Sequence, residues 1–489
     1  MNLPLQLDRK AAKPLQDQLF EQLRQLIIDG KLKPNTRVIA TRFLADQAGV
    51  SRTTVLLAYE RLISEGYLET RPAIGTYVAA LLPDQPRREA NHVALPDIPR
   101  QSSIRPALRF AGEHAEAANE PLEGGFDFSP GHSDASNLLP RKAWLKGVRD
   151  VFEREPDGMA TAPPVAGVLL LRRAIADYLA ATRGIMAAPE QVIIVGGRLQ
   201  TCNLVAHLFQ RSGGRVVLEA PGNEQIAELF GTYRSEIVHV PVDEHGLITD
   251  QLPDGDVSVV YLTPARHNPL GGTLSQLRRE ALIAWARKAG AYIIEDDNDS
   301  ELRYHGTTPQ PLAATDPYGL VFHTGSFAKT LGAGLGLAYL VVPPEFVDPV
   351  IAIKAMAGTN CAWLEQMVVA DLLISGEYQH HLRRVRKIYL ERRDCLIQAL
   401  NQNFDNVRLM GAEAGTQLTW LLPDKLPSAE DICLTASARG VRLGSVSRQG
   451  AASALALRFC NRALILGFAA IACDRLRDGI ARLAEVIGA

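Results

Sequence analysis

The chain has 489 residues, of which 47% are hydrophobic and 22% are charged, and its net charge is −2. This length suits roughly two to four domains, and the composition is typical of a globular protein with a large core. The near-neutral balance excludes a polycation, so any contact with nucleic acid has to be local.

The distribution of cysteines and apolar residues indicates a cytoplasmic protein. Six cysteines are scattered without a C-x-x-C pair, which predicts reduced thiols and neither a disulfide framework nor a zinc site. The N-terminus lacks an apolar signal core, and no run of about 18 apolar residues occurs, so we expect neither secretion nor a membrane span. The histidines lack the neighbours that a metal site needs, so no metal is predicted.

The apolar pattern over residues 1–78 predicts a small N-terminal domain of three helices and a hairpin. Apolar residues recur at helical spacing up to Ile27, before a stop signal at Gly30. A short apolar helix follows, and Ser51 is a good N-cap for a third helix that starts at Arg52. The next stretch alternates like a hairpin with Gly75 at its turn. This order predicts a winged helix-turn-helix.

The third helix would present its N-terminal end to DNA base edges and phosphates. The candidate DNA contacts are Arg42, Ser51, Arg52, Thr53, Thr54 and Arg71. Residues 1–80 carry eleven Lys and Arg against eight Asp and Glu, which is a mildly basic balance. This balance fits a DNA-binding head, and a small helical docking domain is the alternative.

The rest of the chain divides into a linker and a large body. Residues 79–125 are rich in proline, alanine and charge and have weak periodicity, which predicts a linker. In residues 126–489, short β-branched runs such as "QVIIV" and "VSVVYL" are separated by helical stretches. This alternation predicts an α/β body with a mostly parallel sheet.

Polar residues follow four of the predicted strands, where a parallel sheet binds its ligands. Gly197 opens a helix whose free N–H groups can hold an anion. Asn268 follows the second of these strands and Asp296 the third, and Ser326 and Lys329 follow the fourth. Together these residues predict one ligand that has a phosphate, a carbonyl carbon and a protonated ring nitrogen.

Pyridoxal 5'-phosphate (PLP) has these three groups. Lys329 would form the Schiff base, Asp296 would pair with the pyridinium nitrogen, and Asn268 would hydrogen-bond the ring hydroxyl. Taken alone, each residue has a simpler interpretation, as a solvated loop lysine, a strand-end cap or a turn initiator. The neighbouring Asp297 and Asp299 are interpreted as members of a structural ion-pair network.

Two parts of the chain resemble known families. The segments "PLQDQLFEQLRQLIIDGKLKP" and "LADQAGVSRTTVLLAYERLISEGYLETRPAIGTYV" resemble the GntR-type winged helix. The segments "HNPLGG", "IIEDDNDSELRY" and "HTGSFAKTLGAGLGLAYLV" are similar, in order and spacing, to motifs of the fold-type I aminotransferases. Joined in this order, the two parts resemble the MocR-type transcription regulators.

The resemblance implies a PLP-dependent, DNA-binding transcriptional regulator. It implies an aminotransferase-like body with a smaller C-terminal α+β subdomain, and a head-to-tail homodimer on operator DNA. The effector would be an amino compound or PLP itself, with Arg458 or Arg448 as the candidate for binding its carboxylate.

The chain departs from the aminotransferase pattern at residues expected to touch the cofactor. Asn298 replaces a tyrosine near the ring hydroxyl, Gly336 replaces the phosphate-binding arginine, and Asn223 replaces an aromatic residue that often stacks on the ring. Arg266 and Arg198 are candidates to replace the lost charge. Because turnover needs a tightly held ring, these changes argue against efficient catalysis. The alternatives are an active aminotransferase with an accessory head, and a sensor that does not bind PLP.

Overall fold

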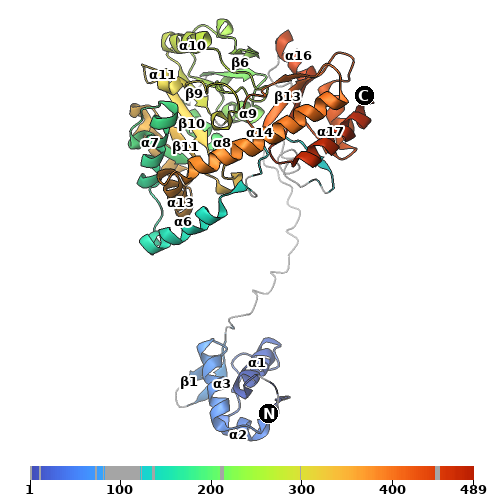
Figure 1. The fold of residues 1–489 in the computed structure, drawn as a ribbon. Helices are drawn as coiled ribbons and strands as arrows, with labels where there is room; N and C mark the ends of the chain where they lie inside the picture. Colours follow the sequence, from blue (N-terminus) through green and yellow to red (C-terminus); the bar gives the residue numbers. More distant parts are fainter. Residues whose placement is uncertain are drawn as a thin grey trace, which may run out of the picture. The chain divides into compact units, whose positions relative to one another are not determined.

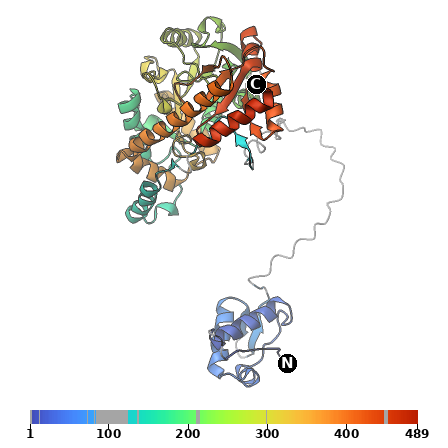
Figure 2. The same cartoon turned by 45° about the vertical axis from the view of Figure 1, so that its right-hand side comes forward.

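The computed structural model describes residues 3–9, 11, 13–71, 74–80, 82, 122, 124–134, 138–209, 214–297, 299–446 and 452–488. The chain forms two compact units, residues 1–105 and 106–489, and each is described by itself (Figures 1 and 2). Most of the predicted linker lies outside the described residues.

The N-terminal unit is a winged helix-turn-helix, as predicted. Its elements are α1 (Leu15–Ile28), α2 (Thr41–Ala48), α3 (Arg52–Ser64), β1 (Leu68–Arg71) and β2 (Gly75–Val78). The two strands pair antiparallel, with Leu68 opposite Val78. One apolar cluster joins the helices to the hairpin, and its most buried members include Leu19, Leu23, Leu44, Val55 and Leu62. The helical spacing of these residues explains why each helix buries a single face.

The body is built on an eight-stranded sheet. Its strands are β4 (Val192–Val195), β5 (Arg215–Ala220), β6 (Glu236–Asp243), β7 (Gly246–Leu247), β8 (Val259–Leu262), β9 (Tyr292–Asp296), β10 (Val321–Ser326) and β11 (Ala338–Val341). The strand order is β4-β11-β10-β9-β8-β5-β6-β7. The five central strands, from β10 to β6, are parallel, whereas β11 and β7 pair antiparallel with their neighbours. The carboxyl ends of the central strands therefore meet at one edge.

Helices cover both faces of this sheet (Figure 1). They are α7 (Leu169–Arg183), α8 (Arg198–Leu208), α9 (Glu224–Thr232), α10 (Gln276–Ala289), α11 (Leu312–Thr315), α12 (Val347–Met356) and α13 (Trp363–Ile374). Val216 and Leu218 pack in a cluster with residues of α8 and α9, whereas the intervening Val217 packs with residues of α10. Burial on both faces explains why the strands read as continuous apolar runs.

A smaller α+β subdomain follows, as the aminotransferase resemblance implies. Its main elements are α14 (Glu377–Asn403), β12 (Arg408–Met410), β13 (Gln417–Leu421), α15 (Ala429–Ser437), β15 (Gly444–Ser445), α16 (Ala454–Arg462), β16 (Ala463–Gly467) and α17 (Cys473–Ile487). Four of its strands form an antiparallel sheet in the order β12-β13-β16-β15. Two further strands, β3 (Phe126–Asp127) and β14 (Val441–Arg442), pair parallel, and α6 (Arg141–Arg154) packs on α13.

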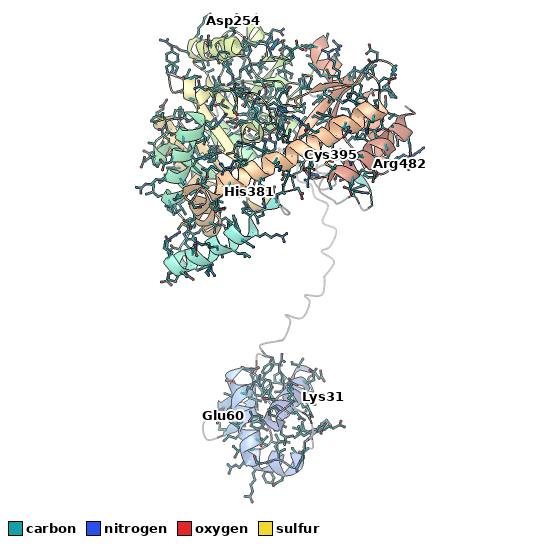
Figure 3. The ribbon with its side chains drawn as sticks, viewed as in Figure 1. Lys31, Glu60, Asp254, His381, Cys395 and Arg482 are labelled. Carbon is teal, nitrogen blue, oxygen red and sulfur yellow. A yellow bond between two sulfur atoms is a disulfide. The ribbon has the colours of Figure 1, made fainter. Side chains whose placement is uncertain are left out.

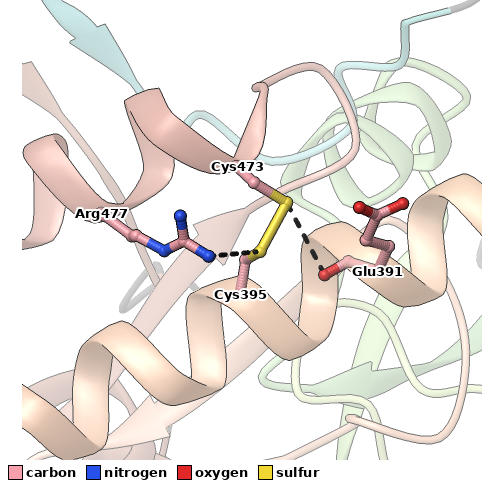
Figure 4. Close-up of a disulfide and its surroundings, with 4 residues drawn as sticks. All are labelled: Glu391, Cys395, Cys473 and Arg477. Carbon is pink, nitrogen blue, oxygen red and sulfur yellow. Dashed lines mark hydrogen bonds between the residues drawn. A yellow bond between two sulfur atoms is a disulfide. The ribbon is translucent and has the colours of Figure 1, made fainter.

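The structure corrects one prediction about the cysteines. Helices α14 and α17 pack side by side, and a disulfide joins Cys395 on α14 to Cys473 on α17, with 5.7 Å between their Cα atoms (Figures 3 and 4). The prediction of six reduced thiols is therefore wrong for this pair. The two residues are 78 positions apart, and only the packing of two helices brings them together.

Among the described residues, none of the helices combines the length and the apolar character that a membrane span requires.

Candidate functional site

A small pocket lies at the carboxyl ends of the parallel strands. It is lined by Arg198, Thr263, Ala265, Arg266, Asn268, Asp296, Asp299 and Lys329. These residues come from the start of α8, the segment after β8, the end of β9 and its following turn, and the segment after β10. The fold thus brings together residues from all four strand ends that the sequence singles out.

Asp296 is the last residue of β9, and its side chain is 1% exposed. The Tyr261 hydroxyl, from the neighbouring β8, donates a hydrogen bond to Asp296 Oδ2 over 2.6 Å, and Arg198 Nη1 lies 3.9 Å from the same oxygen. Burial raises the pKa of Asp296, and the Arg198 charge and the Tyr261 hydrogen bond oppose this rise. Tyr261 was not predicted, because it lies in an apolar run and looks like any core tyrosine.

Lys329 lies beside a second carboxylate. Its amine forms an ion pair with Asp299 Oδ1, and Arg266 Nη1 donates to Asp299 Oδ2 over 3.1 Å. Burial raises the pKa of Asp299, but Lys329 and Arg266 outweigh it and hold this pKa below its ordinary value. Asp299 is therefore a member of an ion-pair network, as interpreted, and it also lines the pocket, which was not predicted. Asp297 keeps that interpretation, since it pairs with Arg183 over 2.7 Å.

The main chain of Asn268 is anchored by a hydrogen bond to Thr263. Its N–H donates to the Thr263 hydroxyl over 3.0 Å, and this hydroxyl donates in turn to Glu219 Oε2 over 2.8 Å. The Thr263 N–H also donates to Glu219 Oε2 over 3.0 Å. The buried Glu219 carboxylate thus orders the segment that carries Asn268. It was not predicted, because nothing in the sequence links the end of β5 to this segment.

The titration of Glu219 predicts a pH-dependent stability. Burial, with a smaller contribution from Asp296, raises the pKa of Glu219 to about 7 from its ordinary 4.5. The folded protein therefore keeps a proton that the unfolded chain releases, and stability present at pH 4.5 is lost as the pH rises through 7. We expect Glu219→Gln, which removes this charge, to raise the free energy of unfolding at pH 8 by roughly 2–4 kcal/mol.

Chemical denaturation of the full chain at several pH values tests this expectation. All four tryptophans lie in the body, so their fluorescence reports its unfolding. The gain should shrink towards pH 5, and Glu153→Gln, which alters an exposed glutamate, should show no such pH dependence. An equal gain at every pH would show that Glu219 is not the titrating group.

Two further predicted cofactor residues, Gly197 and Ser326, and one of the noted departures, Asn223, are not among the residues that line this pocket. Gly197 is the N-cap of α8, with φ of +152°. The Ser326 hydroxyl, at the end of β10, accepts a hydrogen bond from the Ala328 N–H over 3.1 Å. The Asn223 side chain caps α9 by accepting from the Ile226 N–H over 3.3 Å.

Two of the noted departures and both candidate effector arginines remain. Gly336 adopts a left-handed conformation, with φ of +54°, whereas Asn298 and Arg448 lie outside the described residues. Arg458 lies on α16. Its side chain lines a separate groove of about 880 Å³ rather than the Lys329 pocket. Its role with an effector stays a prediction.

In the N-terminal unit, the start of α3 is built as predicted. The Ser51 hydroxyl caps the helix by accepting from the Thr54 N–H over 3.1 Å, and it also lies 2.8 Å from the Thr54 hydroxyl. Arg52 and Thr53 are exposed in the first turn of α3, and Arg42 is exposed at the start of α2. These side chains are therefore accessible to a ligand at the N-terminal ends of α2 and α3.

Arg71 on the wing is held within its own unit. Its guanidinium donates to Glu69 Oε1 over 2.8 Å and to Asn35 Oδ1 over 2.7 Å, and it lies 4.5 Å from the centre of the Tyr77 ring. A contact with DNA would have to compete with these partners.

No group of three or more His, Cys, Asp or Glu residues that could hold a metal ion occurs in the described part of the chain.

Comparisons with known proteins define the class to which this architecture belongs. The family of bacterial regulatory proteins called gntR matches residues 15–78, and aminotransferase class I and II matches residues 127–442. A GntR-type head joined to an aminotransferase-like body is the architecture of a transcriptional regulator. The Thermus thermophilus α-aminoadipate aminotransferase LysN, solved with N-(5'-phosphopyridoxyl)-L-leucine, is 26% identical with a TM-score of 0.67, covering 77% of this chain and 97% of that one.

Full-length relatives identify the family. The probable rhizopine catabolism regulatory protein MocR of Rhizobium meliloti is 32% identical over 97% of this chain and 94% of its own length. The pyridoxine biosynthesis transcriptional regulator PdxR of Corynebacterium glutamicum is 29% identical over 99% of both chains. The protein belongs to the MocR-type family of DNA-binding transcriptional regulators.

Proposed function

We propose that the body binds PLP through Lys329 and that this binding controls the affinity of the head for operator DNA. The observation that carries the proposal is that Lys329 and Asp296 line one pocket. Three cationic side chains, Arg198, Arg266 and Lys329, face two carboxylates there. The residual positive charge suits a phosphate, and the nearly inaccessible Asp296 suits a protonated ring nitrogen.

The pocket residues then have distinct roles. Asp299 would hold the Lys329 side chain in the pocket through their ion pair until the cofactor binds. Asp296 would hold the ring nitrogen and Asn268 the ring hydroxyl. Gly197 and the first turn of α8, together with Ser326, would receive the phosphate. When bound, PLP supplies an aldehyde that can capture the lysine or a free amine.

Arg266 connects the pocket to the C-terminal subdomain. One side of its guanidinium binds Asp299, and Nη2 donates to the Gln417 carbonyl oxygen of β13 over 2.6 Å. Gly415 packs against the same guanidinium, so closely that an added Cβ would lie 2.7 Å from Arg266 Nε. A change of charge at Lys329 alters the electric field at Asp299. Arg266 binds both Asp299 and the Gln417 carbonyl oxygen, so it links Asp299 to this subdomain. This path supports a sensing role for the pocket.

The effector class follows from the same chemistry. An amino compound could compete with Lys329 for the aldehyde, and PLP itself could be the signal; the name of the relative PdxR connects that protein to pyridoxine biosynthesis. The family resemblance implies a head-to-tail homodimer in the cytoplasm. Its two heads would contact paired half-sites on the operator DNA. Inefficient aminotransferase turnover stays a prediction.

Removal of Arg52 tests the DNA-binding part of the proposal. Because Arg52 is exposed in the first turn of α3, we expect Arg52→Ala to weaken operator binding by roughly 1–3 kcal/mol. Fluorescence anisotropy on a duplex taken from upstream of the protein's own gene would measure this loss at fixed salt. Arg61→Ala is the matched control, because Arg61 lies in the last turn of α3 and pairs with Asp17 and Glu65. Equal affinities for the Arg52→Ala variant and the wild type would contradict the assignment.

A further inference from the structure

Arg198 differs from the other two cations of the pocket in how it is held. Lys329 and Arg266 are both bound directly to Asp299. Arg198 Nη1 instead lies 3.9 Å from Asp296 Oδ2, beyond hydrogen-bond range, and its Nε is buried without a hydrogen-bond partner. Its side chain is 30% exposed, against 1% for Asp296. Arg198 thus interacts with Asp296 by charge alone, without a direct hydrogen bond to it.

Arg198 also lies at the anion-binding end of a helix. It is the first residue of α8, directly after the N-cap Gly197, where main-chain N–H groups are free to meet an anion. The turn before α8 adjoins the Gly336 main chain, since a Cβ added at Gly196 would lie 3.8 Å from the Gly336 carbonyl oxygen. Gly336 replaces the phosphate-binding arginine of the aminotransferase pattern, so its position contributes no positive charge there. Of the three cations that line the pocket, only Arg198 belongs to this helix end.

We propose that Arg198 exchanges partners when PLP binds, and this inference rests on the proposed function. In the cofactor-free protein, Arg198 is the counter-charge of Asp296. When the ring nitrogen takes Asp296, the guanidinium turns to the phosphate at the N-terminus of α8. An unphosphorylated ring would displace Arg198 from Asp296 and offer it no anion in return. Arg198 therefore makes the pocket selective for the phosphorylated form of the cofactor.

Titration with PLP and with pyridoxal, which lacks the phosphate, tests the exchange. Visible absorption would report binding of both compounds to the wild type, Arg198→Ala and Arg198→Lys. Loss of one charge-assisted contact should weaken PLP binding to Arg198→Ala roughly 10–100-fold. Pyridoxal should bind this variant at least as tightly as the wild type, and Arg198→Lys should recover part of the preference for PLP. An unchanged ratio of the two affinities would overturn the exchange.

A double-mutant cycle in the cofactor-free protein tests the other half of the proposal. We expect Arg198→Ala to lower the melting temperature at pH 8, because it removes one of the positive charges that stabilise the Asp296 carboxylate, and Asp296→Asn in the same chain to restore part of the loss. If the effects of the two substitutions on the melting temperature were strictly additive, the pairing of Arg198 with Asp296 would be overturned. If the wild type binds neither PLP nor pyridoxal, the proposed function fails and the exchange fails with it. If it binds both and only the ratio is insensitive to Arg198, the exchange alone fails.

Discussion

Replacing Lys329 by alanine is expected to abolish covalent capture of PLP. Lys329 is the only lysine that lines the described pocket, and its amine lies beside Asp299 and at the same pocket as Asp296. The wild type should develop a visible absorption band on addition of PLP. After borohydride reduction its mass should increase by one phosphopyridoxyl group per chain. The Lys329→Ala variant should show neither change.

Lys329→Arg is the matched control for this prediction. Arginine keeps a positive charge beside Asp299, so the pocket stays neutralised, but it is not a nucleophile at neutral pH. This variant should fold like the wild type and should also lack the band and the mass increase. A band that persists in Lys329→Ala would mean that another amine captures the aldehyde.

Replacing Arg266 by alanine is expected to cause a large loss of stability. The Arg266 side chain is 2% exposed, and its removal would leave Asp299 with Lys329 alone and the Gln417 carbonyl without its donor. Breaking a buried ion pair from one side costs about 3 kcal/mol or more. Denaturant unfolding followed by tryptophan fluorescence would measure the loss. Because this link joins the pocket to β13, PLP binding should weaken as well.

An exposed arginine provides the comparison. Arg149 on α6 lies 4.0 Å from Glu153, and both side chains are about 70% exposed. Removing an exposed partner of this kind costs about 0.5 kcal/mol. If Arg266→Ala were no more destabilising than Arg149→Ala, the Asp299–Arg266–Gln417 connection would not contribute to the fold as described.

Much of the fold follows from local patterns in the sequence. Helical spacing in the head, the Ser51 cap and the alternation of apolar strands with helices predicted both domain architectures. The strand ends predicted that Asn268, Asp296 and Lys329 would meet, since a parallel sheet places the carboxyl ends of its strands at one edge. These are short-range signals combined with one general rule of topology.

Contacts between distant segments could not be predicted in the same way. Tyr261 and Glu219 lie inside apolar strands, where only the register of neighbouring strands aims them at Asp296 and Thr263. Asp299 looked like one more acid in a charged turn. Its role in the pocket depends on Arg266, 33 positions earlier in the chain. No local pattern encodes such pairs, because each requires the packing of separate elements.

The operator affinity of the full-length protein, measured with and without PLP, tests the central claim most directly. For the wild type, PLP should change the dissociation constant by roughly 5–150-fold, the usual range of coupling between two sites. For Lys329→Ala, whose head is unaltered, PLP should leave the dissociation constant unchanged. The same PLP response in both proteins, or none in the wild type, would contradict control of DNA binding through Lys329.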